Sequence, residues 1–262
     1  MKRDPIILCA VKDPDRLYQF AKKSDCIASG RVPFHTVSGR RNVPRALNEL
    51  FDKLATEGTI RGSSMVFYMH EDVRLEGQYI ESVMDMLNDE NRVAFHEPFM
   101  IGCCGARFED KPDGTKQSAV YAHMIDRGYV SKNIGNTTFV EVDTLDECFI
   151  GMPFHQKFYE TKSGKHLYAA RTALIDTMRC FVACAETLHH ESEQEWTIND
   201  PMFAFDCGAL YDAVGEFCTP CVTIKETKDG IVIPMYPDLI PRKSPLVPAT
   251  KAGLTLRSLL GK

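Results

Sequence analysis

Three polar residues, His70-Glu71-Asp72, follow directly on the apolar run at residues 64–69. A short run with hardly any polar residue is typical of a strand that is covered on both faces. His70 and Asp72 are two positions apart, so their side chains point to the same side if the extended conformation continues. An imidazole with carboxylate oxygens suits Mn²⁺, whereas carboxylates with phosphate oxygens suit Mg²⁺. This tip is a candidate divalent-cation site, and the simpler alternative is a strand end followed by a solvated acidic turn.

The chain around this tip alternates between strand-like and helix-like patterns. Strand-like runs lie at residues 6–11, 32–37 and 64–69, and helical patterns lie at 15–24, 42–58 and 78–88. The helical pattern at 42–58 has apolar residues at i, i+4, i+7, i+8 and i+11, and Gly58 ends it. This order predicts an α/β protein with a parallel sheet and right-handed crossovers. Ligands of such sheets bind beyond the carboxyl ends of the strands, where the tip at residues 70–72 lies.

The rest of the chain is less regular. Further strands are expected at residues 100–108, 138–142 and 148–152, and helices at 168–189 and 203–214. His189 and His190 would end the first of these helices, where imidazoles interact favourably with the helix dipole. From residue 229 to residue 262 there are five prolines and little periodicity, which indicates a tail wrapped over the surface.

Composition narrows the class of protein. The chain has 262 residues, of which 44% are hydrophobic and 26% charged, as in ordinary globular proteins. Its net charge of -5 provides no global attraction to nucleic acid or anionic lipid. The apolar run at 6–11 is too short for a secretory signal, and no stretch is long enough for a membrane span. Ten cysteines, many of them in apolar runs, then predict reduced thiols in a cytoplasmic protein.

One cysteine pair has metal-ligand spacing. Cys218-Thr-Pro-Cys221 is a CxxC motif, but zinc needs about four ligands and no second such pair accompanies it. We therefore interpret both cysteines as loop or core residues. The alternative is a zinc site completed by His189 and His190.

A family resemblance extends the argument from the tip. Val66-Phe-Tyr-Met-His-Glu-Asp-Val73 resembles the HxDV variant of the metal-binding DxD motif in a group of family-2-like GT-A glycosyltransferases. Gly39-Arg-Arg-Asn42 and Ala46-Leu-Asn48-Glu are similar to the Asn-containing loop and helix of that group. A weaker similarity at residues 140–150 concerns its central strand before the acceptor site. The resemblance covers roughly residues 6–153.

The resemblance implies a GT-A (Rossmann-like) fold, in which a mixed, mostly parallel sheet is flanked by helices in a single domain. The catalytic domain would span residues 1–230. Its nucleotide-sugar-binding half would lie at 1–110 and its acceptor half at 111–230. Residues 231–262 would form a proline-rich tail packed on the domain.

The resemblance also implies a nucleotide-sugar donor, of the UDP type, held by Mn²⁺ or Mg²⁺. Asp72 would be the principal metal ligand, assisted by His70 or Glu71, and we expect its carboxylate to lie exposed in a cleft. The expected contacts to the nucleotide sugar come from Asp13 near the base or ribose, Asn42 and Asn48 near the nucleotide loop, Glu71, and Arg40 and Arg41 beside the diphosphate.

An inverting enzyme of this type needs a general base that takes the proton of the acceptor hydroxyl. Asp200, in Trp196-Thr-Ile-Asn-Asp200, is the best match to the family's acid, although it would equally suit a helix N-cap. Asp143 is the next candidate, followed by Asp146 and Glu147. The family usually has Gly where this chain has Glu147, and its late His-containing segment is not evident here. His189 and His190 are the candidates to substitute for that segment.

Other functions share the broad architecture. A sugar-nucleotidyltransferase would carry a glycine-rich loop after its first strand, and Lys12-Asp-Pro-Asp15 has no glycine. A non-catalytic nucleotide-sugar-binding module is a further alternative. The acceptor could be a glycan, a lipid-linked precursor or a hydroxymethylated base in DNA. A DNA acceptor would need a local basic stripe, with Arg40, Arg41 and Arg45 as candidates, and a flipped-out base.

Overall fold

The computed structural model describes residues 3–38, 42–88, 98–110, 116–126, 129–132, 138–142, 144–154, 156–158, 178–185, 187–191, 225–227 and 230–235, together with 169 and 172.

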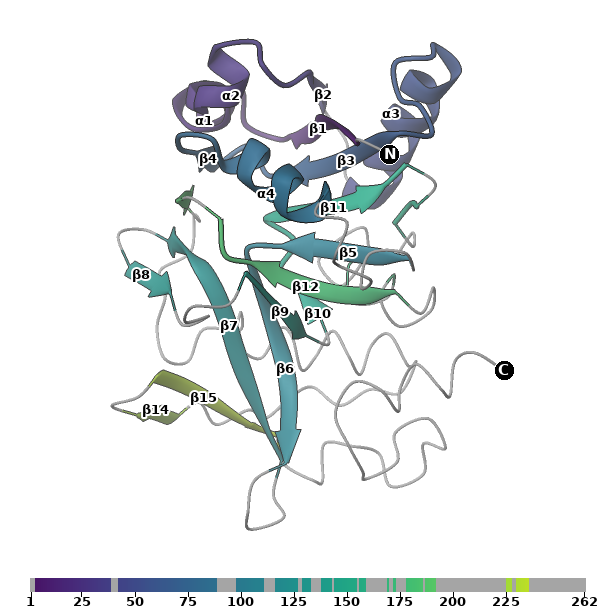
Figure 1. Cartoon of the computed structure of the whole chain (residues 1–262). Coiled ribbons are helices and arrows are strands. Elements are labelled where there is room, and N and C mark those ends of the chain that lie inside the picture. Colours follow the sequence, from purple (N-terminus) through teal and green to yellow (C-terminus); the bar gives the residue numbers. More distant parts are fainter. Residues whose placement is uncertain are drawn as a thin grey trace.

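A seven-stranded sheet organises the described part of the chain, in the order β2-β1-β3-β11-β5-β12-β9 (Figure 1). Its strands are β1 (Asp4–Val11), β2 (Phe34–Ser38), β3 (Ser64–Met69), β5 (Phe99–Gly102), β9 (Phe139–Val142), β11 (Phe149–Pro153) and β12 (Arg179–Ala183). β1 is parallel to β2 and β3, β12 is parallel to β5, and β11 lies antiparallel between β3 and β5. β9 is antiparallel to β12, so every strand except β9 and β11 runs in one direction. The predicted α/β class with a mixed sheet is confirmed, and three of the six strand pairings in this sheet are parallel.

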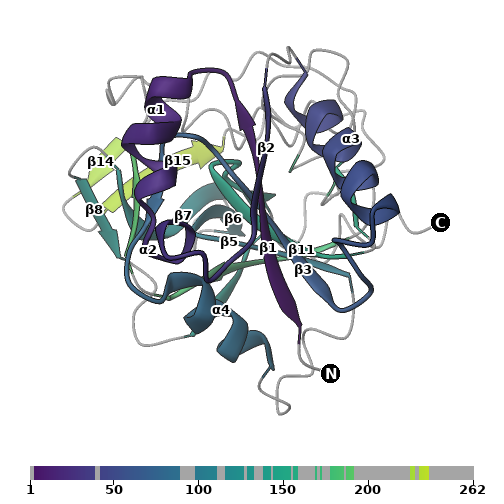
Figure 2. The ribbon, with the colours of Figure 1, turned by 90° about the horizontal axis from the view of Figure 1, so that it is seen from above.

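Helices cover both faces of this sheet (Figure 2). They are α1 (Pro14–Gln19), the 3₁₀ helix η1 (Ala21–Lys23), α2 (Asp25–Ala28), α3 (Val43–Thr56) and α4 (Tyr79–Asn88). Successive side chains of β1 and β3 point to opposite faces. Ile6, Leu8, Val66 and Tyr68 pack with the apolar stripe of α3, whereas Ile7, Cys9, Phe67 and Met69 pack with residues of α1, α2 and α4. Both strands are therefore buried on both sides, as their apolar sequences predict.

A second group of strands packs beside the main sheet. β10 (Thr144–Leu145), β6 (Cys104–Asp110), β7 (Lys116–Asp126), β13 (Leu188–His190) and β4 (Val73–Leu75) are hydrogen-bonded in that order. β8 (Tyr129–Lys132) and β15 (Gly230–Met235) also pair with β7, and β14 (Lys225–Thr227) pairs with β15. The first residues of the expected C-terminal tail thus form a strand.

The local predictions hold best in the first part of the chain. The strands expected at 6–11, 32–37 and 64–69 and the helices expected at 42–58 and 78–88 are present with small shifts at their ends. The strand expected at 100–108 is instead divided at Cys103 into β5 and β6, which belong to different sheets. Among the described residues, no helix has the length and apolar character needed to cross a membrane.

The helix expected at 168–189 is wrong over its second half, which forms β12 and β13. The apolar residues there do recur at helical spacing. However, Cys180, Phe181 and Val182 are consecutive and all buried, which suits a strand covered on both faces. Pairing with β5 and β9 decides the conformation. His189 and His190 are consequently strand residues, and the helix-dipole role expected for them is wrong.

Candidate metal centre

The tip at residues 70–72 lies at the edge of the sheet where the parallel strands β1 and β3 end. β11 runs the opposite way and begins at this edge, with Phe149 opposite Met69. The backbone N–H of His70 donates a hydrogen bond to the carbonyl oxygen of Cys148, 2.9 Å away. The tip therefore occupies the position at which ligands of α/β sheets bind, as predicted.

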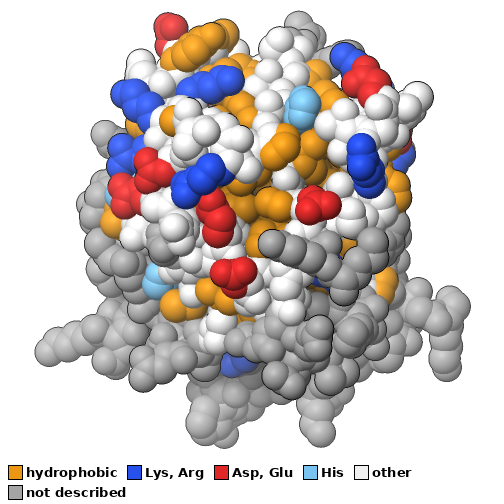
Figure 3. Space-filling model, turned by 45° about the horizontal axis from the view of Figure 1, so that its top comes forward, with side chains coloured by type: hydrophobic (Ala, Val, Ile, Leu, Met, Phe, Trp, Pro, Cys, Tyr) orange, Lys and Arg blue, Asp and Glu red, His pale blue; other side chains and the backbone are white. Residues whose placement is uncertain are grey.

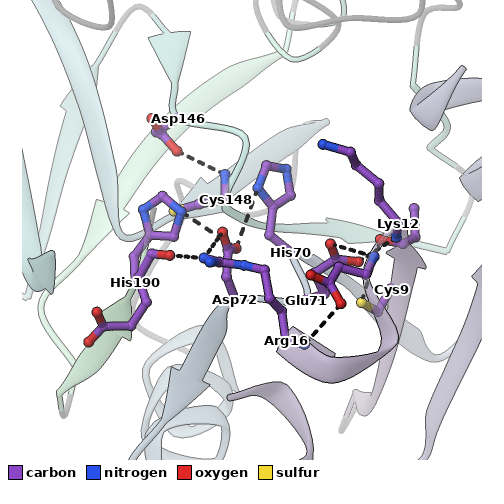
Figure 4. A network of polar contacts seen from close by, with 12 residues as sticks. Cys9, Lys12, Arg16, His70, Glu71, Asp72, Asp146, Cys148 and His190 are labelled. Carbon is purple, nitrogen blue, oxygen red and sulfur yellow. Dashed lines mark hydrogen bonds and ion pairs between the residues drawn. The ribbon is translucent and has the colours of Figure 1, made fainter. Parts of the chain in front are cut away.

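His70 and Asp72 are joined at this edge by His190. The Nδ1 atom of His70 lies 4.0 Å from Oδ1 of Asp72, and Nε2 of His190 lies 3.6 Å from the same oxygen. The three potential ligand atoms are all within 4.8 Å of one another. Figure 4 shows the two imidazoles approaching the Asp72 carboxylate, His70 from the turn after β3 and His190 from β13. Two imidazoles and a carboxylate thus converge on one point.

Strand pairing brings His190 to the tip. β4 begins immediately after Asp72, and β13 pairs with it antiparallel, with His190 opposite Val73. The N–H of Glu191 also donates to the carbonyl oxygen of Asp72, at 3.0 Å. Because side chains alternate along a strand, His190 faces Asp72 while Nε2 of the neighbouring His189 lies 2.9 Å from Oε1 of Glu76. The sequence marks His190 only as a possible contact, since this pairing is not visible in it.

The Asp72 carboxylate is held in a fixed orientation. Its Oδ2 is 3.0 Å from an amino group of Arg16, and its side chain is only 13% exposed. Its Oδ1 is buried, and no described residue donates a hydrogen bond to it. The expectation that this carboxylate lies exposed in a cleft is wrong, because the Arg16 side chain and β13 cover it. A buried carboxylate oxygen without a donor costs free energy unless a cation or proton satisfies it.

The donor set fits a divalent cation. Metal–ligand bonds of about 2.0–2.2 Å place neighbouring ligand atoms roughly 3.0–3.5 Å apart. The separations of 3.6 and 4.0 Å from Oδ1 of Asp72, and of up to 4.8 Å among the three ligand atoms, would have to shorten for one cation to contact all three. Two nitrogens and one oxygen suit Mn²⁺, Fe²⁺ or Zn²⁺ better than Mg²⁺ or Ca²⁺, which prefer oxygen ligands. Three protein ligands leave coordination positions for a substrate.

Glu71 points away from this cluster, toward the turn between β1 and α1 (Figure 4). Its carboxylate accepts hydrogen bonds from the backbone N–H groups of Lys12, at 2.5 Å, and Asp13, at 3.0 Å. Burial raises the pKa of Glu71 above its ordinary value, and these two hydrogen bonds act against that rise. Glu71 therefore fixes the β1–α1 turn against the tip, and its described contacts are to backbone groups.

The other predicted nucleotide contacts fall into different places. Asp13 lies beside the tip and caps α1, accepting hydrogen bonds from the N–H groups of Asp15 and Arg16. Asn42 caps α3 by accepting from the N–H of Arg45. Asn48 is buried in α3 on the opposite face of the sheet from α1. The structure brings Asp13 and Glu71 to the tip, but it does not bring Asn48 there.

Several predicted site residues lie outside the described residues. These are Arg40, Arg41, Asp143, Asp200, Cys218 and Cys221. The other two candidates for the general base, Asp146 and Glu147, lie within the described residues. Glu147 is only 3% exposed, and its carboxylate accepts a hydrogen bond from the N–H of Ala169. Asp146 is half-buried at the same sheet edge as the tip, where it accepts from the N–H of Cys148 at 2.8 Å.

Fold and site together define an α/β protein with a candidate metal centre at the carboxyl edge of its main sheet. No family model matches the sequence, and no curated protein matches it either. Among solved structures, the chain is similar to one described as "Crystal Structure of A197 from STIV". The two sequences are 11% identical, the match covers 75% of this chain and 98% of the other, and the TM-score is 0.40. A likeness at this level supports no conclusion about fold or activity.

Proposed function

We propose that this chain is a metal-dependent glycosyltransferase of the GT-A type, which transfers a sugar from a nucleotide sugar to an acceptor hydroxyl. The observation that carries the proposal is the convergence of His190 on His70 and Asp72 at the carboxyl edge of β3. The HxDV segment resembles the metal-binding motif of GT-A enzymes, and this resemblance is the reason for proposing a nucleotide-sugar donor. Two of the three candidate metal ligands, His70 and Asp72, belong to the segment that carries this resemblance.

His70, Asp72 and His190 would hold the cation, Mn²⁺ in the first instance because two of the three donors are nitrogens. A bound cation would neutralise the diphosphate of the donor and stabilise its charge as it leaves. Glu71 would keep the β1–α1 turn against the tip through the N–H groups of Lys12 and Asp13. Asp13 would then lie beside the nucleotide.

Asp200 and Asp143 remain the proposed general bases, with Asp146 as a further candidate. Asp146 is linked to the tip through Cys148. The carboxylate of Asp146 accepts a hydrogen bond from the N–H of Cys148, and the carbonyl oxygen of Cys148 accepts one from the N–H of His70. Glu147 is a poor candidate because its carboxylate is buried in the core. Asp146→Asn should lower turnover more than donor affinity if Asp146 takes the acceptor proton.

The acceptor is proposed to be a glycan or lipid-linked hydroxyl, with a hydroxymethylated DNA base as the alternative. On the face turned forward in Figure 3, acidic and basic side chains are interspersed around exposed apolar groups. Such mixing favours no phosphate-binding stripe on the described part of that face. Binding to duplex DNA that weakens steeply between low and moderate salt would favour the DNA acceptor.

A turnover assay tests the proposal. The full chain is incubated with a panel of UDP-sugars, and release of UDP is measured with Mn²⁺ and with EDTA. We expect Mn²⁺-dependent release that Asp72→Asn abolishes and that Asp85→Asn, an exposed change on α4, leaves unchanged. Asp72→Asn should also lower the free energy of unfolding by about 1–3 kcal/mol, because Arg16 loses its charged partner. Equal turnover in the wild type and Asp72→Asn would contradict the proposal.

The same assay separates the alternatives. Release of pyrophosphate from a nucleoside triphosphate and a sugar phosphate would indicate a nucleotidyltransferase, and UDP-sugar binding without turnover would indicate a binding module. The donor set itself favours one further class, because two histidines and one carboxylate also ligate non-haem Fe²⁺ in oxygenases. Oxygen consumption by the Fe²⁺-loaded chain, without any Mn²⁺-dependent sugar transfer, would favour that class.

A further inference from the structure

Arg16 contacts two parts of the candidate metal centre at once. Its guanidinium lies 3.0 Å from Oδ2 of Asp72, and it also donates to the carbonyl oxygen of Glu191. Asp72 belongs to the tip, whereas Glu191 directly follows His190 at the end of β13. One side chain therefore links the carboxylate ligand to the strand that supplies the second imidazole (Figure 4).

Arg16 is itself held in place. It lies in the first turn of α1, where the side chain of Asp13 accepts its backbone N–H at 3.4 Å. Glu71 fixes Asp13 in turn by accepting its N–H. The guanidinium also lies over the ring of Phe20, 5.5 Å from its centroid, and the side chain is only 20% exposed. Asp13 thus holds the backbone of Arg16, and Phe20, the residue that follows α1, packs against its guanidinium.

This arrangement leaves Asp72 with one oxygen for an ion. Oδ2 is engaged by Arg16, and Oδ1 is the oxygen that faces both His70 and His190. A carboxylate whose orientation was free could rotate, or could bind an ion through both oxygens. Partners that orient a ligand in this way commonly raise metal affinity by about 10–100-fold.

We propose that Arg16 is a positioning residue of the metal centre, which fixes Asp72 as a one-oxygen ligand and holds β13 so that His190 faces it. The inference rests on the metal site of the proposed function. It concerns the arrangement of the site and holds for whichever divalent cation binds there.

Charge and geometry predict opposite effects when Arg16 is removed. A guanidinium beside a cation site repels the ion, so on charge alone Arg16→Gln would bind the metal more tightly. If Arg16 acts by positioning, Arg16→Gln binds the metal more weakly because Asp72 and β13 lose their common anchor. The sign of the change in affinity therefore decides between the two roles.

The experiment measures binding of Mn²⁺ by calorimetry and the visible absorption spectrum of the Co²⁺ adduct, both on the full chain. Arg16→Gln should bind Mn²⁺ at least 10-fold more weakly than the wild type and give a changed Co²⁺ spectrum. Arg31→Gln is a matched control, because Arg31 also contacts a carboxylate, that of Glu81, and a carbonyl oxygen, that of Gly77, away from the site. It should leave affinity and spectrum unchanged.

A second variant covers the case in which Arg16→Gln does not fold. Arg16→Lys keeps the charge, but both acceptors contact one terminal nitrogen of Arg16, Nη2, and the ammonium nitrogen of a lysine ends one bond short of that position. We expect it, too, to weaken Mn²⁺ binding and alter the Co²⁺ spectrum. Unchanged or tighter binding in either folded variant would overturn the positioning role while leaving the metal site intact. A wild-type chain that binds neither ion would overturn both the metal site and this inference.

Discussion

His190 and Asp72 lie far apart in the sequence, yet Nε2 of His190 is 3.6 Å from Oδ1 of Asp72. The contact exists because β13 pairs antiparallel with β4, the strand that follows Asp72. Two backbone hydrogen bonds flank the same region, from His70 to Cys148 and from Glu191 to Asp72. The imidazole of His190 is therefore fixed to the tip by the sheet, and not by the side-chain contact alone.

Adjacent histidines on β13 provide a direct test of the metal centre. His190→Ala removes one of the three donors and should lower Mn²⁺ affinity by at least about 10-fold, since even outer partners of a ligand contribute that much. His189→Ala changes the neighbouring position, whose Nε2 lies 2.9 Å from Glu76, and should leave affinity unchanged. Calorimetric titration of both variants with Mn²⁺ measures the difference. Equal losses would mean that the ion does not bind through His190.

Local patterns predict the first part of the fold because the elements there have regular spacing and clear ends. The stripe of α3 is bounded by a capping Asn42 and by Gly58, which adopts a φ of 73°. No comparable signal marks β13, which has only three residues and depends on partners from distant segments. The helical spacing of Phe181 and Leu188 therefore predicts a helix where the chain forms strands.

The residues of the candidate site also differ in whether a sequence pattern predicts them. Residues 70–72 are visible in the sequence because a buried strand ends there. The contributions of His190 and Arg16 depend on contacts across the sheet edge, which a sequence pattern does not contain. Conversely, the resemblance implies a nucleotide contact for Asn48, but the side chain of Asn48 bonds to the backbone of Phe158 inside the core.

Asn48 should therefore matter for stability and not for ligand binding. Its Nδ2 donates to the carbonyl oxygen of Phe158 at 2.8 Å, and its Oδ1 accepts the N–H of Phe158 at 3.1 Å. Asn48→Ala leaves both backbone groups buried without these partners, and should lower the free energy of unfolding by about 2–4 kcal/mol in urea titrations. Affinity for Mn²⁺ and UDP should stay unchanged in the folded variant. A large loss of UDP affinity without loss of stability would restore the nucleotide contact.

Gly151 tests the insertion of β11 between β3 and β5. A Cβ atom at this position would lie 2.7 and 2.8 Å from ring carbons of Phe67 and 2.9 Å from Cγ2 of Ile101. Gly151→Ala should therefore overpack the core and lower the free energy of unfolding by about 1–3 kcal/mol. Gly62→Ala is the matched control, because no atom lies within 4 Å of its added Cβ. The two variants should differ clearly in urea midpoint, and similar midpoints would contradict this packing of β11.

His35, on β2, provides a test of pH dependence away from the metal centre. Burial lowers the pKa of His35, with Glu57 raising it and Lys53 lowering it further. The unfolded chain then binds a proton more readily than the folded one, so stability is lost as the pH falls below about 6.5, the ordinary histidine pKa. His35→Gln removes this contribution and should lose less stability than the wild type between neutral and mildly acidic pH. Urea unfolding of both proteins at several pH values measures the difference. If the free energies of unfolding of the two proteins change with pH in parallel, or if the wild type gains stability relative to the variant in acid, the folded state does not disfavour the charged imidazole.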